Sequence, residues 1–113
     1  MNESCIFCQI AQKKVAANIV YEDESFIAFH DINPQAPVHI LIITKRHIPS
    51  AANLTDNDSD LIGQMVLRAN SIAQEIGLDN NYRLVINVGK DAGQTVFHLH
   101  MHIIGGQVLG RIA

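Results

Sequence analysis

Apolar residues recur at every third or fourth position between residues 56 and 76, and this period predicts one long amphipathic helix. The apolar stripe consists of Leu61, Ile62, Met65, Val66, Ala69, Ile72, Ala73 and Ile76. Thr55 and Asp58 have the spacing of a capping box at its start, and Gly77 is placed to end it. Residues 5–13 show the same spacing, which predicts a short helix near the beginning of the chain.

Five further runs have the length and composition of β-strands. They cover residues 18–22, 25–30, 38–43, 82–88 and 96–104. Only Asp23 and Glu24 separate the first two runs, which predicts a hairpin, and the third is apolar on both faces except for His39, which predicts a central strand. Short connections between strands, with helices before and between them, predict an α+β fold with a mostly antiparallel sheet. We find no repeat and no domain boundary, and expect a single domain over residues 1–113.

The fifth run contains His98, His100 and His102 at a spacing of two. On a strand these side chains point to one face, and the alternate residues fill the other face, namely Phe97, Leu99, Met101 and Ile103. A solvated polar face would not need three imidazoles, and one metal ion cannot easily bind all three, because the outer two are about 13 Å apart along a strand. We favour a central nucleophile or base flanked by supporting histidines.

The loop before the histidines strengthens this interpretation. Residues 89–95 contain two glycines, an amide and a hydroxyl, and they lead directly into the histidine strand. Flexible backbone N–H groups in such a loop can form a nest for a phosphate group.

Composition limits the classes of partner. The chain has 113 residues, 48% of them hydrophobic, with a net charge of −3. This acidic balance argues against nucleic acid, which would require a basic surface. No apolar run approaches the length of a membrane span, so we expect a soluble, cytoplasmic protein with no membrane partner.

The only two cysteines, Cys5 and Cys8, form a C-x-x-C pair. Three interpretations remain open from the residues alone: half of a zinc site, two half-buried thiols, or a redox pair. A redox pair of the thioredoxin type would normally follow a strand, and no strand is predicted before Cys5.

The sequence His-Leu-His-Met-His-Ile-Ile at residues 98–104 resembles the signature of the histidine triad (HIT) superfamily. Further blocks resemble its Hint branch, the histidine triad nucleotide-binding proteins, and the resemblance extends over residues 5–108. These blocks are residues 29–39, 87–89, 93–97 and 105–106.

The resemblance implies a HIT-like fold, with a five-stranded antiparallel sheet, one long and one short helix, and a ten-stranded sheet across a homodimer. It also implies a hydrolase that cleaves the P–N bond of purine nucleoside 5′-phosphoramidates, and acyl-adenylates, through a covalent nucleotidyl-histidine intermediate. The alternatives are a dinucleoside polyphosphate hydrolase of the Fhit type and a non-catalytic nucleotide-binding regulatory module.

The resemblance implies site residues as well. His100 matches the nucleophile, His102, Gln94 and Thr95 would hold phosphate or leaving-group oxygens, and His39 and His98 would support the nucleophile or relay a proton. Asp31 matches the residue that binds the ribose hydroxyls. The remaining residues expected to bind the nucleotide are Phe7, Ile10, Phe29, Ile32, Leu41, Asn87 and Gly93.

Some bacterial members of the superfamily bind zinc through a C-x-x-C pair and two histidines, which here would be His47 and His98. The resemblance therefore implies a structural Zn²⁺ held by Cys5, Cys8, His47 and His98, with no cofactor required for catalysis. A zinc-bound His98 could not also relay protons. Two departures from the family pattern are a C-terminal tail without tryptophan and Val15-Ala16-Ala17 in place of an Ile-Pro turn, which we expect to be a minor change.

Overall fold

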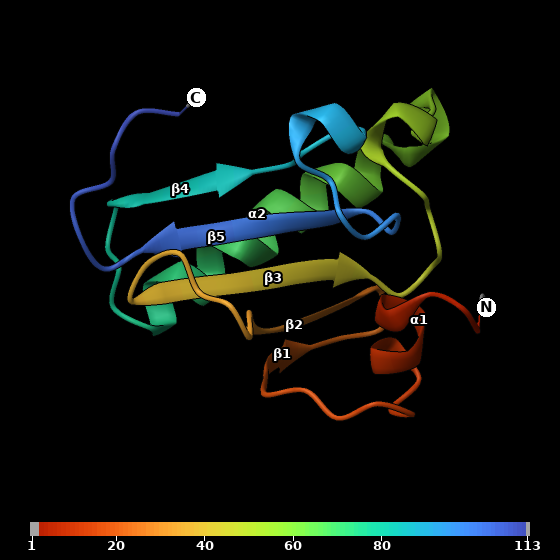
Figure 1. Cartoon of the computed structure of the whole chain (residues 1–113), viewed down its shortest axis with the longest axis horizontal. Helices are drawn as coiled ribbons and strands as arrows, with labels where there is room; N and C mark the ends of the chain where they lie inside the picture. Colours follow the sequence, from red (N-terminus) through yellow and green to blue (C-terminus); the bar gives the residue numbers. More distant parts are fainter. Residues whose placement is uncertain (1–2, 113) are drawn as a thin grey trace.

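The computed structural model describes residues 3–112, so residues 1, 2 and 113 of the predicted domain lie outside the described part. Its strands are β1 (Ile19–Glu22), β2 (Phe26–His30), β3 (Val38–Thr44), β4 (Tyr82–Val85) and β5 (His100–Gly105). They form one antiparallel sheet in the order β1-β2-β3-β5-β4 (Figure 1). This confirms the five-stranded antiparallel sheet and the central position of β3.

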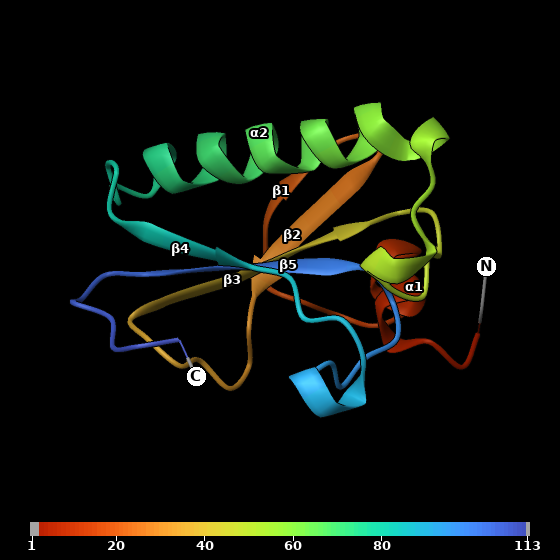
Figure 2. The ribbon, with the colours of Figure 1, turned by 90° about the horizontal axis from the view of Figure 1, so that it is seen from above.

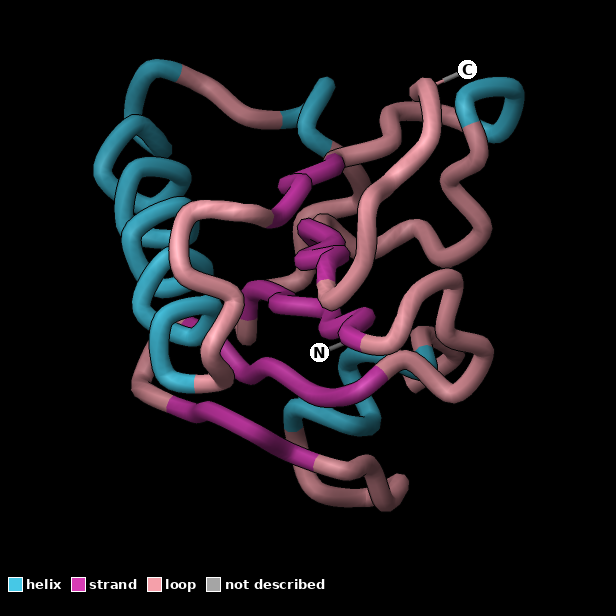
Figure 3. The backbone as a smooth tube through the Cα atoms, turned by 90° about the vertical axis from the view of Figure 1, so that its left-hand side faces the viewer, coloured by secondary structure: helices cyan, strands magenta, loops and turns pink. Residues whose placement is uncertain are grey.

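Two helices cover opposite faces of the sheet. The long helix α2 (Ser59–Glu75) packs on one face, and the short helix α1 (Ile6–Ala11) lies on the other (Figure 2). Viewed along the sheet, α2 runs beside the strands on one side, while α1 and most of the long loops lie on the other (Figure 3). No helix of the described residues is long and apolar enough to cross a membrane.

The main core lies between α2 and the sheet. Met65, Ala69 and Ile72 of α2 pack there with Leu99 and Met101 from the histidine segment. A second apolar cluster lies beneath α1 on the other face, where Phe7 and Ile10 contact Phe29 and Leu41. His39 of β3 and His100 and His102 of β5 alternate with residues of the main core, so these three side chains face the smaller α1 layer, where a site can form.

The predicted start and end of the long helix are confirmed with one refinement. Thr55 and Asp58 form the capping box around a single 3₁₀ turn, Asp56–Asp58, and the α-helix follows from Ser59. Gly77 ends the helix with a φ of +86°, where its N–H donates to the carbonyl oxygen of Gln74. Only glycine adopts this backbone conformation at little cost.

The strand prediction over 96–104 was wrong at its beginning. β5 starts at His100, because the N–H of Leu99 donates to the carbonyl oxygen of Ile48 outside the sheet, at 2.6 Å. Phe97 therefore does not join the core as predicted: its side chain is 51% exposed, whereas Leu99 is buried. The strand predicted over 82–88 is likewise shorter and ends at Val85.

Candidate active site and metal cluster

His100 begins β5 and is held in one tautomer. Its Nδ1–H donates to the backbone carbonyl of His98 at 2.7 Å, so Nε2 carries the free lone pair. The residue is only 7% exposed, and burial lowers the pKa of its imidazole below the ordinary value. A neutral imidazole with one locked and one free nitrogen is suited to nucleophilic attack.

A second chain of hydrogen bonds sets the tautomer of His102. The N–H of Gln35 donates to Nδ1 of His39 at 3.0 Å, so the hydrogen of that ring is on Nε2. His39 Nε2 lies 2.8 Å from Nδ1 of His102 and 3.4 Å from a carboxylate oxygen of Asp31. His102 therefore accepts at Nδ1 and presents Nε2–H. Burial, followed by the neighbouring His100 and His39, lowers the pKa of His102 to about 4.

His100 and His102 border a cavity of about 340 Å³ between α1 and the sheet, and His39 lies outside its lining. His100, His102 and Thr95 lie on its wall together with the predicted ribose ligand Asp31. The cavity also brings together all five apolar residues predicted to enclose a base: Phe7, Ile10, Phe29, Ile32 and Leu41. Ile32 is 91% exposed, so it borders the cavity without belonging to the core.

Three residues of the predicted nucleotide site do not line this cavity. The side-chain amide of Gln94 donates to the carbonyl oxygens of Pro49 and Val96 and accepts from the N–H of Gly89. Gln94 is 2% exposed and its hydrogen bonds hold the loop together, and its expected contact with phosphate oxygens stays a prediction. Asn87 and Gly93 lie beside each other outside the cavity lining.

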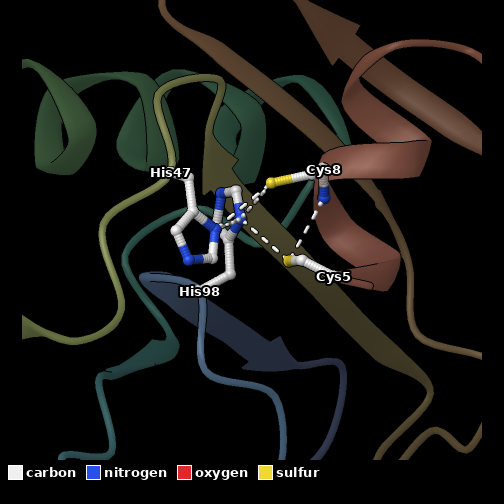
Figure 4. Close-up of side chains that lie close together, drawn as sticks. All are labelled: Cys5, Cys8, His47 and His98. Atoms are coloured by element: carbon white, nitrogen blue, oxygen red, sulfur yellow. Dashed lines mark hydrogen bonds between the residues drawn. The ribbon is translucent and has the colours of Figure 1, made fainter. Parts of the chain in front are cut away.

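His98 belongs to a different cluster from His100 and His102. Its Nδ1 is 3.3 Å from Sγ of Cys5, 3.5 Å from Sγ of Cys8 and 3.2 Å from Nδ1 of His47 (Figure 4). His47 Nδ1 in turn lies 3.2 Å from Sγ of Cys8. The four ligand atoms are all within 4.8 Å of one another, and neither cysteine is in a disulfide.

This cluster fits a zinc ion. Neighbouring ligand atoms of a tetrahedral Cys₂His₂ zinc site are about 3.3–3.8 Å apart, given its bond lengths. His98 is fully buried, and its Nε2–H donates to the carbonyl oxygen of Thr44 at 2.6 Å, which leaves the Nδ1 lone pair free for a metal. Cys5, Cys8, His47 and His98 would hold the ion, and a His98 ring bound to it could not also relay a proton.

A second group of potential ligands, Asp31, His39 and His102, does not fit a metal equally well. The N–H of Gln35 occupies the lone pair of His39 Nδ1, so His39 Nε2 carries a hydrogen and cannot also ligate. Its contacts with Asp31 and His102 are therefore hydrogen bonds. The two clusters differ because the main-chain partner of His98 is a carbonyl, which accepts a hydrogen bond and leaves a lone pair on the other nitrogen, whereas that of His39 is an N–H, which donates and leaves the other nitrogen protonated.

Sequence reasoning missed several contributors. The N–H of Gln35 and the carbonyl of Thr44 act through the main chain, so their residue types carry no signal. Val15, Ala16 and Ala17, which we expected to be a minor variation, line the cavity beside Phe7. The departure of these three residues from the family's Ile-Pro turn was the feature of the sequence that could have pointed to them. A larger open cavity of about 740 Å³, between residues 77–83 and 106–109, contains no histidine or cysteine.

The family model described as "Scavenger mRNA decapping enzyme C-term binding" matches residues 4–112. Protein HitA of Neisseria gonorrhoeae is 46% identical over 106 residues, which are 94% of this chain and 99% of the relative. An uncharacterised HIT-like protein of Synechocystis is 48% identical over 107 residues, 95% of this chain and 94% of the relative.

The chain belongs to the HIT family.

Solved structures support the same assignment. A HIT family hydrolase from Legionella pneumophila superposes with a TM-score of 0.92 at 46% identity, covering 94% of this chain and 96% of that one. A histidine triad protein from Clostridium difficile has a TM-score of 0.96 at 39% identity, covering 100% and 99%. The HIT fold predicted from the sequence is confirmed, and the family is one of hydrolases and nucleotide-binding proteins.

Proposed function

We propose that this HIT protein is a single-domain nucleotidyl hydrolase of the Hint branch that cleaves purine nucleoside 5′-phosphoramidates, and acyl-adenylates. The observation that carries the proposal is the state of His100. Its Nδ1–H is bound to the His98 carbonyl and its Nε2 is free, on the wall of a cavity with a carboxylate, a hydroxyl and an apolar lining.

In the proposed reaction, His100 Nε2 attacks phosphorus and forms a P–N bond as the bond to the leaving nitrogen breaks, and that nitrogen takes a proton from solvent and departs as the neutral amine. Water then attacks phosphorus and gives up a proton to solvent, the P–N bond to His100 breaks, and the nucleoside monophosphate and neutral imidazole are released. His102 Nε2–H and the Thr95 hydroxyl would bind phosphate oxygens and stabilise the charge that develops there.

The remaining cavity residues would bind the nucleoside. Asp31 would accept hydrogen bonds from the ribose hydroxyls, because a carboxylate oxygen is a strong acceptor. Phe7 packs edge-on against both Phe29 and His100, with ring centroids 5.6 and 5.1 Å apart, and forms an apolar wall suited to a purine. A Zn²⁺ in the Cys₂His₂ cluster would link α1 to the segment before β5 and take no part in this chemistry.

The central experiment incubates the protein with adenosine 5′-phosphoramidate and, separately, with diadenosine polyphosphates. We expect cleavage of the phosphoramidate, and an adduct with the mass of one adenylyl group on His100 in rapidly quenched samples. His100→Ala should lose both, while His30→Ala, which removes an exposed histidine at the end of β2, should retain both. Faster cleavage of the polyphosphates would favour the Fhit-type alternative, and nucleotide binding without cleavage would favour the regulatory module.

We also propose a homodimer in which two sheets join along β4. In the described sheet β4 pairs only with β5, so one edge of β4 is available for a second copy. Sedimentation at several concentrations would detect it, and a concentration-independent monomer would contradict it. We place the protein in the cytoplasm because two cysteines held for a metal must remain reduced.

A further inference from the structure

A second cavity adjoins the proposed nucleotide site and has no role in the reaction described above. It has a volume of about 340 Å³ and is lined by the N-terminal segment, His47 and residues 95–97. Ile6, Thr95 and Val96 line both cavities, so the two lie on either side of a shared wall that contains Thr95. Thr95 is exposed, so a molecule bound at its hydroxyl can extend to either side.

The second cavity has a wall of mixed polarity without an acidic or basic side chain of the Asp, Glu, Lys or Arg type: Ile6, Val96 and Phe97 are apolar, and Ser4 and Thr95 are polar. Phe97 and Ile6 are 51% and 41% exposed at its wall, and neither belongs to the two apolar cores. Sγ of Cys5 and Nδ1 of His47 are turned toward the metal cluster, where they contact His98 and Cys8. The exposed ring of Phe97 at the cavity wall offers a surface on which another aromatic group can stack.

We propose that this cavity binds the substituent on the leaving amine of the substrate, and that Phe97 determines a preference for an uncharged aromatic group. The inference rests on the proposed function. The first cavity is sized for one nucleoside monophosphate, with Thr95 at the phosphate. The group on the other side of phosphorus must then lie beyond Thr95, where the adjoining cavity offers an aromatic side chain and no charge to pair with.

The test compares three adenosine 5′-phosphoramidates, with an unsubstituted amine, an N-benzyl group and an N-carboxymethyl group. The wild-type protein should prefer the N-benzyl over the N-carboxymethyl substrate by about tenfold in kcat/KM. Phe97→Ala should reduce kcat/KM for the N-benzyl substrate by about tenfold, mainly through KM, and change the unsubstituted substrate by about twofold or less. Phe97→Leu should recover part of the loss.

Val88→Ala is the matched control, because Val88 is 44% exposed and lines neither cavity. This substitution should leave kcat/KM unchanged for all three substrates. Equal effects of Phe97→Ala on all three substrates, or an equal preference of the wild type for N-benzyl and N-carboxymethyl groups, would overturn the proposal while leaving the hydrolase function intact.

A binding measurement separates failure of the subsite from failure of the hydrolase proposal. Adenosine 5′-O-(N-benzylsulfamate) lacks a cleavable P–N bond, so its affinity can be measured by calorimetry without turnover. Weaker binding to Phe97→Ala by about fivefold, with no change for AMP, would support the subsite even if no phosphoramidate is cleaved. Equal affinity of both proteins for the sulfamate would overturn it.

Discussion

Nε2 of His39 lies 2.8 Å from Nδ1 of His102, and through this contact a main-chain amide determines the tautomer of a histidine on the cavity wall. The Gln35 N–H fixes the hydrogen of His39 on Nε2, and that hydrogen in turn occupies Nδ1 of His102. The nitrogen of His102 available to a phosphate oxygen is consequently a donor. A loop rich in proline, residues 31–37, thereby determines a property of the histidine two strand positions after the proposed nucleophile.

Replacing His39 by alanine should lower kcat by about 10- to 100-fold, because His102 would lose the partner that keeps its Nε2 protonated. His39→Gln places an amide donor near the position of Nε2 and should recover part of this loss. Since His39 is buried and lies behind His102, KM should change less than kcat.

The tautomer of His102 provides a readout that a purely structural role would not affect. Nitrogen chemical shifts should report hydrogen on Nε2 in the wild type and a mixture of tautomers in His39→Ala. An unchanged tautomer together with an unchanged kcat would contradict this role of His39.

Gln94 is expected to act on stability. It is 2% exposed, and its amide joins Pro49, Val96 and Gly89, so Gln94→Ala would remove three hydrogen bonds to part-buried main-chain groups. We expect the free energy of unfolding to fall by about 2–3 kcal/mol in urea denaturation. Gln64→Ala, on the exposed side of α2, is the control and should stay within about 0.5 kcal/mol of the wild type. A loss of phosphate affinity without a loss of stability would support the contact first expected for Gln94.

The elements of the fold could be predicted because their hydrophobic periods are long and regular. The helix around residues 59–75 has an apolar period of three to four residues over several turns, and the strand 38–44 is a short, β-branched apolar run that follows a loop with two prolines. The beginning of β5 could not be predicted. Apolar and polar residues still alternate through residues 96–99, as in a strand. The Leu99 N–H, however, donates to the carbonyl oxygen of Ile48 instead of to a neighbouring strand, and the position of Ile48 depends on a loop about 50 residues earlier in the chain.

The parts of the site that depend on the type of side chain could be predicted from the sequence. The cluster Cys5, Cys8, His47 and His98 came from a family resemblance, and the structure brings all four together. The tautomers of His98 and His39 depend on the main-chain atoms of Thr44 and Gln35; any residue supplies the carbonyl, and any residue except proline supplies the N–H. Gln94 was assigned to phosphate because an amide in a glycine loop can face either way, and only the packed loop shows that it faces inward.

The metal cluster predicts that protein purified without chelators contains about one zinc ion per chain, measured by atomic emission. Removing the ion should lower Tm by about 5 °C or more, because the coordinate bonds that join α1 to the segment before β5 are lost and only weaker contacts remain. Cys8→Ser should abolish zinc retention, and His30→Ala should not. A metal content near zero, with no rise in Tm when Zn²⁺ is added, would contradict the assignment.

His102 should make folding stability depend on pH in the acid range. Its pKa in the folded protein is about 4, below the ordinary value of 6.5, because burial and the neighbouring imidazoles disfavour the charged ring. The unfolded chain therefore takes up a proton below pH 6.5 that the folded protein takes up only near pH 4. As the pH is lowered from 6.5 to about 4, the free energy of unfolding should therefore fall, by at most about 1.4 kcal/mol per pH unit for this one proton. In His102→Gln the slope should be shallower, and proton resonances of the wild-type ring should titrate near pH 4. A ring that titrates at pH 6 or above, or an equal slope in the two proteins, would show that His102 is not held neutral by its surroundings.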